Sequence, residues 1–450
     1  MNTKSNFSNR IGFVLAAAGS AVGLGNLWRF PYLAAKYGGG TFLFIYLVFA
    51  LTFGFTMMMT EVAIGRKTGK SVIGAFAALD KRFTFLGYLS ALIPLIIFPY
   101  YCVIGGWVIK YMLLYVTNQS AYAATDGAFG TFIGSTTEPL LLFIIFIVLS
   151  AVIVRFGVQK GVEKFSKLLM PALVLLSIGI AIYGLTVDGA MAGVKYYLTP
   201  DFSKLSIRAV CAALGQLFYS LSIAMGILVT YGSYLKKKDD LGKSITQIEF
   251  FDTGIAFLSA LIVIPAVFAF SGGDPATLGA GPSLMFIALP KVFDNMAMST
   301  IIGFSFFVLV FFAALTSAVS LFETIVSIFM EKFSWTRKKA CVIGLGISLL
   351  MGVPSALGYG TWGNVTIIGM QFLDFFDFIS NTVLMPIAAL CTCILVGHIL
   401  KPQVIYDEVS SSGKFSRYKM YCVMIKYLGP LLLGMILVSS ILNTFGIITL

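Results

Sequence analysis

Long apolar stretches, each long enough to cross a lipid bilayer, recur along almost the whole chain. A transmembrane helix needs about 20 mostly apolar residues, and polar segments divide the sequence into eleven such predicted spans. The predicted spans cover about 11–36, 41–64, 84–116, 139–155, 164–186, 207–234, 242–271, 298–330, 339–356, 364–399 and 418–446. The pattern predicts one all-α polytopic membrane domain over residues 1–450, without a sizeable soluble domain.

Two of these spans, the first and the sixth, are interrupted by glycine and polar residues. The first reads AGSAVGLGN over 18–26, and the sixth reads GQLFYSLSIAMG over 215–226. Glycine costs about 1 kcal/mol relative to alanine in a helix, so both stretches favour a break. Broken helices five spans apart are typical of inverted-repeat transporters. We predict a first repeat over about 11–186, a second over 207–399 and an additional helix over 418–446, with close helix packing at small residues as the alternative.

The composition and charge agree with a membrane protein. Apolar residues make up 58% of the chain and charged residues 11%, with a mean hydropathy of +0.94, whereas a soluble chain carries about 25% charged residues. Lys and Arg concentrate in alternate loops, at 66–82, 155–167, 236–243, 332–339 and 414–419. This positive-inside pattern predicts a multi-pass membrane protein with a cytoplasmic N-terminus and, with eleven spans, an extracytoplasmic C-terminus. The net charge of +12 therefore sets topology and does not indicate a nucleic-acid partner.

Several other features narrow the class. No cleavable signal peptide is apparent, because the first ten residues are polar and no small-residue cleavage site follows. The six cysteines lie in or beside apolar segments, so no disulfide is expected. The 272–297 connection, which holds Pro275, Pro282 and Pro290, predicts re-entrant or capping helices. The sequence lacks a metal-binding His/Glu cluster, a Ser–His pair and a filter repeat, which argues against an enzyme or a channel.

The residues around the first break carry a resemblance to a known family. The first span continues as GSAVGLGNLWRFPY over 19–32, followed by GGG at 38–40. This run resembles the first helix of the sodium:neurotransmitter symporter family, whose bacterial member LeuT gave its name to the LeuT fold. The match continues in order through Glu61, Tyr100–Tyr101, Gly215–Gly226, Ala313–Ser317 and Asp374–Asp377. It implies eleven transmembrane helices, a 5+5 inverted repeat with helices 1 and 6 broken, and sodium-coupled transport by alternating access. The count of eleven spans resembles the bacterial branch of the family rather than the twelve-span animal carriers, which implies the bacterial inner (plasma) membrane.

The resemblance implies two sodium sites at the breaks, because unwound helix supplies free carbonyl oxygens. The ligands implied for the first ion, together with the substrate carboxylate, are the Ala21 carbonyl, the Asn26 amide oxygen and the Ser220 hydroxyl. The ligands implied for the second ion are the carbonyls of Gly19, Val22 and Ala313 and the hydroxyls of Thr316 and Ser317. Hydrogen bonding to carbonyls of their own helix is the alternative for the last two residues. No organic cofactor is implied.

The substrate class follows from Gly23. Monoamine carriers of the family have an aspartate at this position that binds the ligand amine, so a chain with glycine needs a substrate that brings its own carboxylate. The resemblance therefore implies an amino acid, whose carboxylate would meet the Leu24 and Gly25 amides and the Tyr101 hydroxyl at the positive end of a half-helix. The carbonyls implied to bind its ammonium group are those of Ala21, Tyr219 and Ser222.

The side-chain pocket implied by the resemblance is mostly apolar. Its residues would be Ile97, Ser222, Met225, Ser317 and Leu321, close to Ser220. This lining predicts a neutral, hydrophobic or aromatic L-amino acid. A proton-coupled amino-acid transporter of a neighbouring family with the same fold is the alternative, and sodium dependence of uptake separates the two.

Asp252 lies within the seventh span, where a carboxylate is functional by default. Animal members of the family bind chloride near the positions of Tyr46, Gln216 and Ser220, and Asp252 resembles a carboxylate of bacterial members that supplies this negative charge. We therefore group Asp252 with the ion-site residues and predict chloride-independent transport, leaving counter-transport of a proton open. A structural hydrogen bond to a serine is the alternative.

Two gates are also implied by the resemblance. On the outer side, Arg29 and Asp377 would approach each other directly or through water, above Tyr101 and Tyr219. Tyr219 stands where the family usually has phenylalanine, and Ala224 stands where it often has glycine.

On the inner side, Lys4 and Glu331 would form the corresponding pair. Lysine lacks the bidentate fork of the arginine usual in the family, so this gate is expected to be weaker or to use Arg10 and Tyr234 instead. Glu61 is expected to bond free amides at the first break, and no role can be assigned to Glu323.

Overall fold

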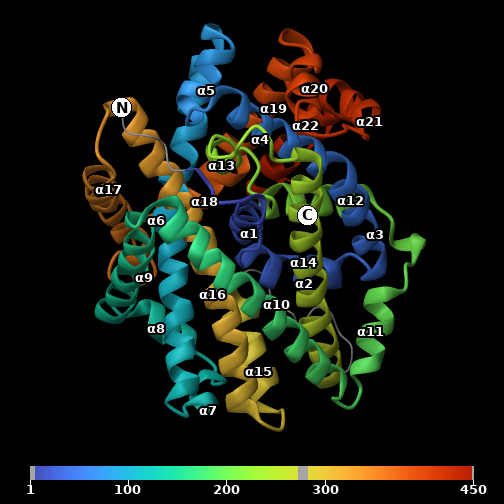
Figure 1. Ribbon diagram of the computed structural model, residues 1–450. Helices are drawn as coiled ribbons and strands as arrows, with labels where there is room; N and C mark the ends of the chain where they lie inside the picture. Colours follow the sequence, from blue (N-terminus) through green and yellow to red (C-terminus); the bar gives the residue numbers. More distant parts are fainter. Residues whose placement is uncertain (1–5, 272–281, 448–450) are drawn as a thin grey trace.

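The computed structural model describes residues 6–271 and 282–447 and shows a helical bundle in these ranges (Figure 1). The helices of spans one to five are α1 (Arg10–Ala21), η1 (Gly25–Arg29) and α2 (Phe30–Lys36); α3 (Gly40–Phe49), η2 (Ala50–Gly54) and α4 (Phe55–Thr68); α6 (Thr84–Val116); α9 (Thr137–Arg155); and η4 (Val158–Glu163) with α10 (Lys164–Leu185). Within the described ranges, the only β pairing consists of two isolated bridges, Gly39 with Pro200 and Ile367 with Met370.

The second half of the chain contains the remaining six spans. The helices of spans six to eleven are α12 (Ile207–Ser220) and α13 (Ile227–Gly232); α14 (Leu241–Ser271); α16 (Ser299–Phe333); α17 (Arg337–Leu357); α18 (Phe372–Asp377), η8 (Phe378–Leu384), α19 (Met385–Ile394) and η9 (Leu395–Ile399); and α21 (Tyr418–Val423), η10 (Met424–Leu428) and α22 (Gly429–Thr444). The connecting helices are α5 (Val72–Leu79), η3 (Lys81–Phe83), α7 (Ser120–Ala123), α8 (Ala128–Gly134), α11 (Ala190–Leu198), η5 (Phe202–Lys204), η7 (Leu284–Ala288), α15 (Leu289–Asp294) and α20 (Gln403–Ser410).

The predicted spans correspond to these helices, with two informative differences. In the described residues nine helices are long and apolar enough to cross a membrane, or ten when the two halves of the first span are counted together. The remaining predicted span is the sixth, whose pieces α12 and α13 are too short and too widely separated to cross as one helix. The tenth begins at Phe372 rather than near 364, because turns occupy the preceding segment.

The first span lies at the centre of the bundle. α1 packs against α10, α14 and α16, and Figure 1 shows it surrounded by the longer helices. Large apolar side chains face outward on the peripheral helices, among them Leu175, Phe250 and Leu350, which are 70%, 75% and 77% exposed. An apolar perimeter is what a lipid environment requires, while the polar residues of the breaks lie inside.

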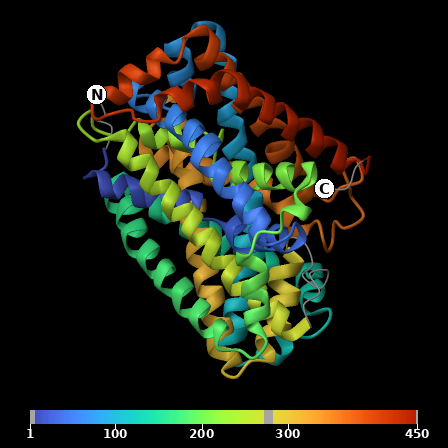
Figure 2. The same ribbon diagram turned by 90° about the vertical axis from the view of Figure 1, so that its right-hand side faces the viewer.

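The short connecting helices divide between the two ends of the bundle. α5 and α20 lie at the end that carries the N-terminus, and α7 and α15 lie at the opposite end (Figure 1). α20 is held to α4 by Arg66, whose Nε is 2.7 Å from Glu408 Oε1 in a buried ion pair. Figure 2 shows α10 and α14 running side by side along the bundle.

Candidate functional site

The first span is broken between Ala21 and Gly25. Val22 has an extended backbone with φ −71° and ψ 96°, and the two halves of the span are bent by 55°. A helix that ends leaves its last carbonyls without intrahelical partners, and a helix that starts leaves free N–H groups. Gly25 is required because a Cβ there would lie 2.7 Å from the Tyr219 ring. The break therefore presents polar backbone inside the bundle.

The sixth span is broken between Ser220 and Ile227. Three residues of this break have left-handed backbones, with φ of 53° at Ser222, 64° at Ala224 and 72° at Gly226. This conformation costs about 1–2 kcal/mol for a residue other than glycine. At Ala224 the cost is offset by the buried Glu61, whose Oε1 accepts a hydrogen bond from the Ala224 N–H at 2.7 Å.

The position of Glu61 corrects one expectation from the sequence. Its carboxylate supports the break of the sixth span and not the amides around Gly23–Gly25. The physical reason is the packing of α4, which lies against α13. The side chain therefore reaches the second break, while the first break is held by other groups.

Direct hydrogen bonds join the two breaks. The Ser222 Oγ donates to the Ser20 carbonyl at 3.1 Å and lies 3.4 Å from the Ser20 Oγ. The Gln216 Nε2 donates to the Gly25 carbonyl at 3.0 Å. The Ser20 carbonyl is one that an intact first helix would bond internally, whereas the Gly25 carbonyl also accepts from the Phe30 N–H. The two contacts join the broken helices into one unit.

A pocket with an empty volume of about 370 Å³ lies between the two breaks. The pocket is lined by Ser20, Ala21, Gly23, Leu24, Gly25, Asn26, Ile97, Tyr101, Tyr219, Ser220, Ser222, Met225, Ile227, Ser317 and Leu321. All eleven residues predicted to bind substrate are among these. Ser20 and Ile227 were not singled out, although Ser20 stands inside the glycine-rich run.

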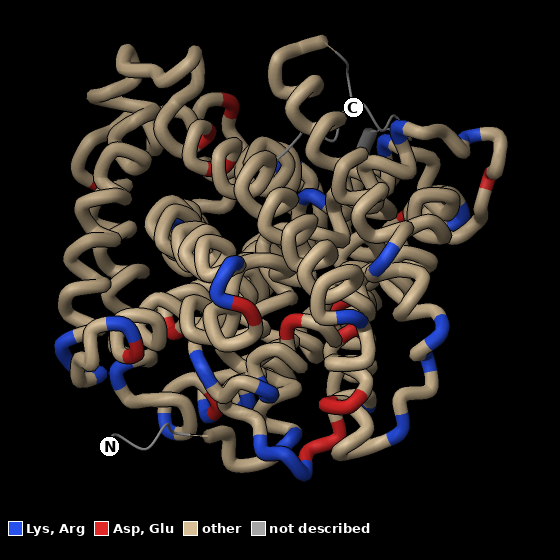
Figure 3. The backbone as a smooth tube through the Cα atoms, turned by 90° about the horizontal axis from the view of Figure 1, so that it is seen from above, with Lys and Arg blue, Asp and Glu red and all other residues tan. Residues whose placement is uncertain are grey.

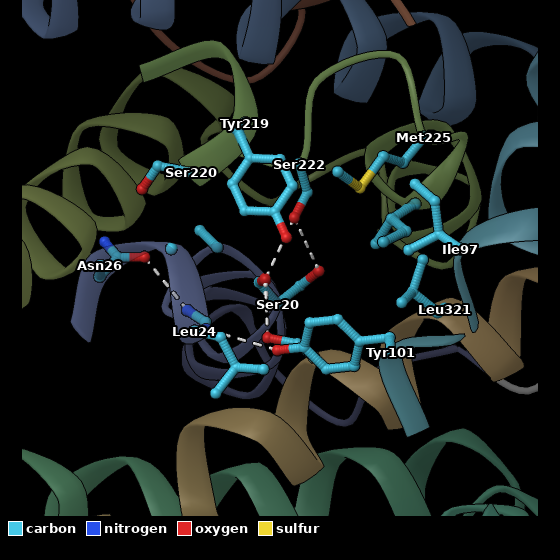
Figure 4. Close-up of a pocket in the computed structure, with 15 residues that line it drawn as sticks. Ser20, Leu24, Asn26, Ile97, Tyr101, Tyr219, Ser220, Ser222, Met225 and Leu321 are labelled. Carbon is cyan, nitrogen blue, oxygen red and sulfur yellow. Dashed lines mark hydrogen bonds between the residues drawn. The ribbon is translucent and has the colours of Figure 1, made fainter. Parts of the chain in front are cut away.

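The pocket has a polar end and an apolar end. Figure 4 shows Ile97, Met225 and Leu321 together on one side and Asn26, Ser220 and Leu24 on the other. The Leu24 N–H donates to the Tyr101 hydroxyl at 3.4 Å. A Cβ at Gly23 would lie 3.0 Å from the Ser317 Oγ and 3.3 Å from the Tyr101 hydroxyl, so a side chain at position 23 would compete for this space.

The residues predicted for the second ion lie together beside the first break. The Ser317 Oγ is 3.2–3.3 Å from three carbonyl oxygens, those of Gly19, Ser20 and Val22. The Thr316 Oγ1 instead donates within its own helix, at 2.9 Å to the Phe312 carbonyl and 3.1 Å to the Ala313 carbonyl. The alternative of local hydrogen bonding thus describes Thr316 but not Ser317. All these groups are oxygens, the donor type that hard cations prefer.

Asp252 connects the residues predicted for the first ion. Its Oδ1 accepts hydrogen bonds from the Asn26 Nδ2 at 2.8 Å and from the Ser220 Oγ at 2.7 Å. Its Oδ2 accepts from the Tyr46 hydroxyl at 3.1 Å. The side chain of Asp252 is fully buried. The Asn26 Oδ1 accepts from the Gly23 N–H at 3.2 Å.

A larger vestibule of about 1,640 Å³ lies next to the pocket, and both share Tyr219. Arg29 and Asp377 both line it. The Arg29 guanidinium stacks on the Tyr219 ring at 5.7 Å from its centroid, and Asp377 Oδ1 accepts from the Tyr100 hydroxyl at 3.0 Å. The two charged groups face the same space without forming a direct ion pair. Asp374, also in the vestibule, accepts from Tyr359 at 3.1 Å.

At the end that carries the N-terminus, the sixth span is tied to α16 and α17. The Tyr234 hydroxyl donates to Glu323 Oε1 at 2.8 Å. The Arg337 guanidinium donates to both carboxylate oxygens of Glu323, at 2.6 and 2.9 Å. Phe7 packs edge-on against Tyr231, and its N–H donates to the Tyr234 carbonyl. Glu323, which had no role from the sequence, is thus the buried centre of this network.

The predicted inner pair is only partly placed. Lys4 lies outside the described residues, while Glu331 Oε2 accepts from the Ser71 N–H at 2.6 Å at the start of α5. Arg10, one of the two residues expected to replace the Lys4–Glu331 pair, instead donates to Gln247 of α14 at 2.7 Å. Tyr234, the other one, donates to Glu323 in the inner network described above. Of these two residues, only Tyr234 therefore belongs to that network.

Two broken helices that enclose a central pocket, inside a bundle with an apolar perimeter, define a membrane transporter of the LeuT fold. A model of the sodium:neurotransmitter symporter family matches residues 4–132 and 131–447. The chain belongs to this family, which consists of sodium-dependent symporters and not of enzymes.

Individual relatives agree with the family assignment. An uncharacterised sodium-dependent transporter of Haemophilus influenzae is 34% identical over 455 residues, covering 97% of this chain and 98% of that protein. A similar protein of Bacillus subtilis is 34% identical over 454 residues, covering 98% of both chains. The crystal structure of MhsT in complex with L-phenylalanine superimposes with a TM-score of 0.87 at 36% identity, covering 97% of this chain and all of that one.

Proposed function

We propose that this sodium-dependent symporter imports a neutral, hydrophobic or aromatic L-amino acid without needing chloride. The observation that carries the proposal is the pocket between the breaks, where free backbone groups and hydroxyls face three apolar side chains. The polar end would bind the amino and carboxyl groups that all amino acids share. The apolar end, formed by Ile97, Met225 and Leu321, would select the side chain, and methionine adapts to different shapes.

The pocket of this chain favours a substrate that carries its own carboxylate. Gly23 leaves no acidic group at the first break, and the Leu24 N–H and Tyr101 hydroxyl are placed to receive an anion there. MhsT, which is 36% identical to this chain, is seen in complex with L-phenylalanine, and the apolar side chains of Ile97, Met225 and Leu321 in the pocket here would suit such a side chain. We propose that the substrate carboxylate also completes the first sodium site.

We propose two sodium ions as co-substrates. The first would be held by the Ala21 carbonyl, the Asn26 Oδ1 and the Ser220 Oγ. The second would be held by the carbonyls of Gly19, Val22 and Ala313 with the hydroxyls of Thr316 and Ser317. The residues fit this role because the donor atoms are uncharged oxygens, and because Ser317 already lies within 3.3 Å of the carbonyls of Gly19 and Val22.

Chloride independence is supported by the buried carboxylate of Asp252. It accepts hydrogen bonds from Tyr46, Asn26 and Ser220, and these donors would otherwise suit a bound anion. A fixed negative charge next to the first sodium site would partly balance the charge of the ion. An added chloride would then be repelled rather than required.

We further propose that the N-terminus faces the cytoplasm of a bacterial cell and that the vestibule opens to the outside. Sodium and amino acid would enter past Arg29 and Asp377, and Tyr219 would close over the pocket. The inner network around Glu323 would then open as the broken helices and their neighbours move relative to α16 and α17. Ligands drive this cycle only by binding the two states with different affinity.

The test is a thermal-shift panel of the twenty amino acids, run in sodium and in potassium. Stabilisation by hydrophobic or aromatic L-amino acids in sodium alone is expected. Stabilisation that is equal in potassium would contradict sodium coupling at this site. Uptake of the best ligand into proteoliposomes, with gluconate replacing chloride, is expected to keep most of its rate, and a loss of most uptake would overturn chloride independence.

A further inference from the structure

Two cavities outside the transport pocket meet near the end that carries the N-terminus. The first is a crevice of about 1,360 Å³ on the side of the bundle, lined by η2, α10 and α14. Its walls are almost entirely apolar and open outward, since Leu51 and Phe250 are 50% and 75% exposed. Figure 2 shows α10 and α14 side by side along this flank. The crevice therefore faces the acyl chains of the bilayer.

The second cavity is a basic basin of about 1,230 Å³. Its charged residues come from α1, from α14 and the residue before it, and from the segment before α21. The basic ones are Arg10, Lys243, Lys414 and Arg417, and the acidic one is Asp240. Asp240 is 3.8 Å from Lys243, so it offsets one of the four cations. Figure 3 views the end of the bundle where the basin lies, with Lys and Arg spread over the loops.

The crevice and the basin adjoin each other. Both are lined by Thr246 and Arg417. The Arg417 guanidinium lies 4.6 Å from the centroid of the Phe55 ring and is held by the Leu51 carbonyl and by Glu249 Oε2, each at 3.4 Å. Arg417 thus stands where the apolar wall ends and the charged wall begins, an arrangement typical of residues at a membrane interface.

Four cations outnumber the two acidic groups near them, Asp240 and Glu249. Lys414 is exposed and has no ion pair with a described residue. Lys243 has a side chain that is 76% exposed. These lysines are consequently available to a ligand that carries negative charge, while the adjoining crevice requires a ligand that carries an apolar chain.

We propose that an anionic phospholipid binds here, with its phosphate in the basin and an acyl chain in the crevice between α10 and α14. Basic pockets at the cytoplasmic side of membrane helices suit anionic headgroups, and burial of each methylene group adds about 0.8 kcal/mol. A zwitterionic lipid lacks the net charge, and a soluble phosphate leaves the crevice unused. The site therefore selects a lipid of the phosphatidylglycerol type.

Bound lipid would link helices that belong to different parts of the transporter. The basin takes Arg10 from the first half of the broken first span, Lys243 from α14, and Lys414 and Arg417 from the segment leading to α21. Glu249, which pairs with Arg417, precedes Asp252 of the transport site by three residues, about one helical turn. The lipid would consequently favour the state in which α1 packs against α14.

The test measures lipid retention and does not depend on transport. Purified protein is equilibrated with equal amounts of phosphatidylglycerol and phosphatidylcholine, and retained lipids are counted by native mass spectrometry. Preferential retention of phosphatidylglycerol is expected. The K243A/K414A variant should lower this preference at least about fivefold, which corresponds to about 1 kcal/mol. The matched variant K160A/K338A, which removes two exposed lysines elsewhere, should leave it unchanged.

The crevice is tested by filling it. A Cβ at Gly254 meets no atom within 4 Å, so G254F should occupy the acyl-chain space without a clash and displace the lipid. G346F, at another open helical glycine away from the crevice, is the control. Equal retention of phosphatidylglycerol and phosphatidylcholine by the unmodified protein would overturn the proposal. It would also be overturned if K160A/K338A lowered the preference for phosphatidylglycerol as much as K243A/K414A does. Displacement of phosphatidylglycerol by excess glycerol phosphate would also overturn it, because the basin would then bind soluble phosphate.

Discussion

Asn26 connects the first break to the seventh span through one fully buried side chain. Its Nδ2 donates to Asp252 at 2.8 Å and its Oδ1 accepts from Gly23 at 3.2 Å. Asn26→Ala removes a proposed sodium ligand, so sodium-driven uptake should fall at least about tenfold, which equals about 1.4 kcal/mol of binding free energy. Stabilisation by sodium plus amino acid in a thermal-shift assay should disappear. Asn295→Ala, at an exposed asparagine, should retain both, and unchanged uptake by Asn26→Ala would contradict the assignment.

Asp252 gives a second prediction at the scale of one residue. Asp252→Ser removes a negative charge but leaves the hydrogen-bond donors of Tyr46, Asn26 and Ser220 directed at the vacated space. Uptake by this variant should be low in gluconate and should rise several-fold when chloride is added. Asp126→Ser, at an exposed residue far from the site, should show no chloride effect. Equal uptake in both anions would contradict the proposed role of the carboxylate.

The positions of the break residues could be predicted from the sequence, but their contacts could not. Clustered glycine and polar residues within an apolar span favour a break, as in the first and sixth spans, whereas the pair Gly105–Gly106 lies inside the continuous helix α6. The resemblance supplied the residues that face the two breaks. The left-handed backbones of Ser222 and Ala224 could not be predicted from the sequence, because neither serine nor alanine favours positive φ. The partner of Glu61 depends on the rotation of α4, which an apolar pattern around the whole helix does not reveal.

The second broken helix depends on an element outside itself. Ala224 keeps its left-handed conformation while its N–H is bonded to Glu61 of α4. Glu61→Ala should destabilise the protein by about 1–3 kcal/mol, because a buried N–H loses its partner. Glu61→Gln keeps an acceptor oxygen and should cost much less. Thermal unfolding in detergent, with and without sodium and substrate, measures both variants, and equal loss in the two would refute this role.

The inner end of the bundle is held by a connection between α16 and α17. Glu323 is completely buried and paired with Arg337, whose side chain is 19% exposed. Arg337→Ala should lower the free energy of unfolding by about 3–5 kcal/mol, because the carboxylate is left buried without its cation. Combining it with Glu323→Gln should recover most of this loss. A double variant as unstable as Arg337→Ala, measured by thermal unfolding, would argue against the pairing.

This network also shows why elements far apart in the bundle were not joined by sequence reasoning. Glu323 and Arg337 lie in consecutive helices, separated by a turn at Ser334, which has φ of 53°. Tyr234 reaches the same carboxylate from the sixth span. Each residue alone is compatible with an interfacial position. Only the packing of three helices places them together.

At the scale of the whole molecule, the vestibule and the inner network should be open at different times. Thr382 of η8 lines the vestibule near Asp377 and is partly buried. In Thr382→Cys, labelling by a membrane-impermeant thiol reagent should slow several-fold when sodium and substrate are both present, because closure over Tyr219 narrows the vestibule. Neither ligand alone should have the full effect if the substrate carboxylate completes the first ion site.

The control for this experiment lies on the same end of the molecule but outside the vestibule. Thr125 is exposed in the connection between α7 and α8, so labelling of Thr125→Cys should not respond to ligands. The six native cysteines are buried or half-buried, and labelling of the unmodified protein gives the background. Equal labelling of Thr382→Cys with and without ligands would contradict closure of the vestibule. If substrate slowed the labelling of Thr382→Cys equally in potassium, closure of the vestibule would not need sodium. That result would argue against coupling of sodium and substrate through the pocket between the two breaks.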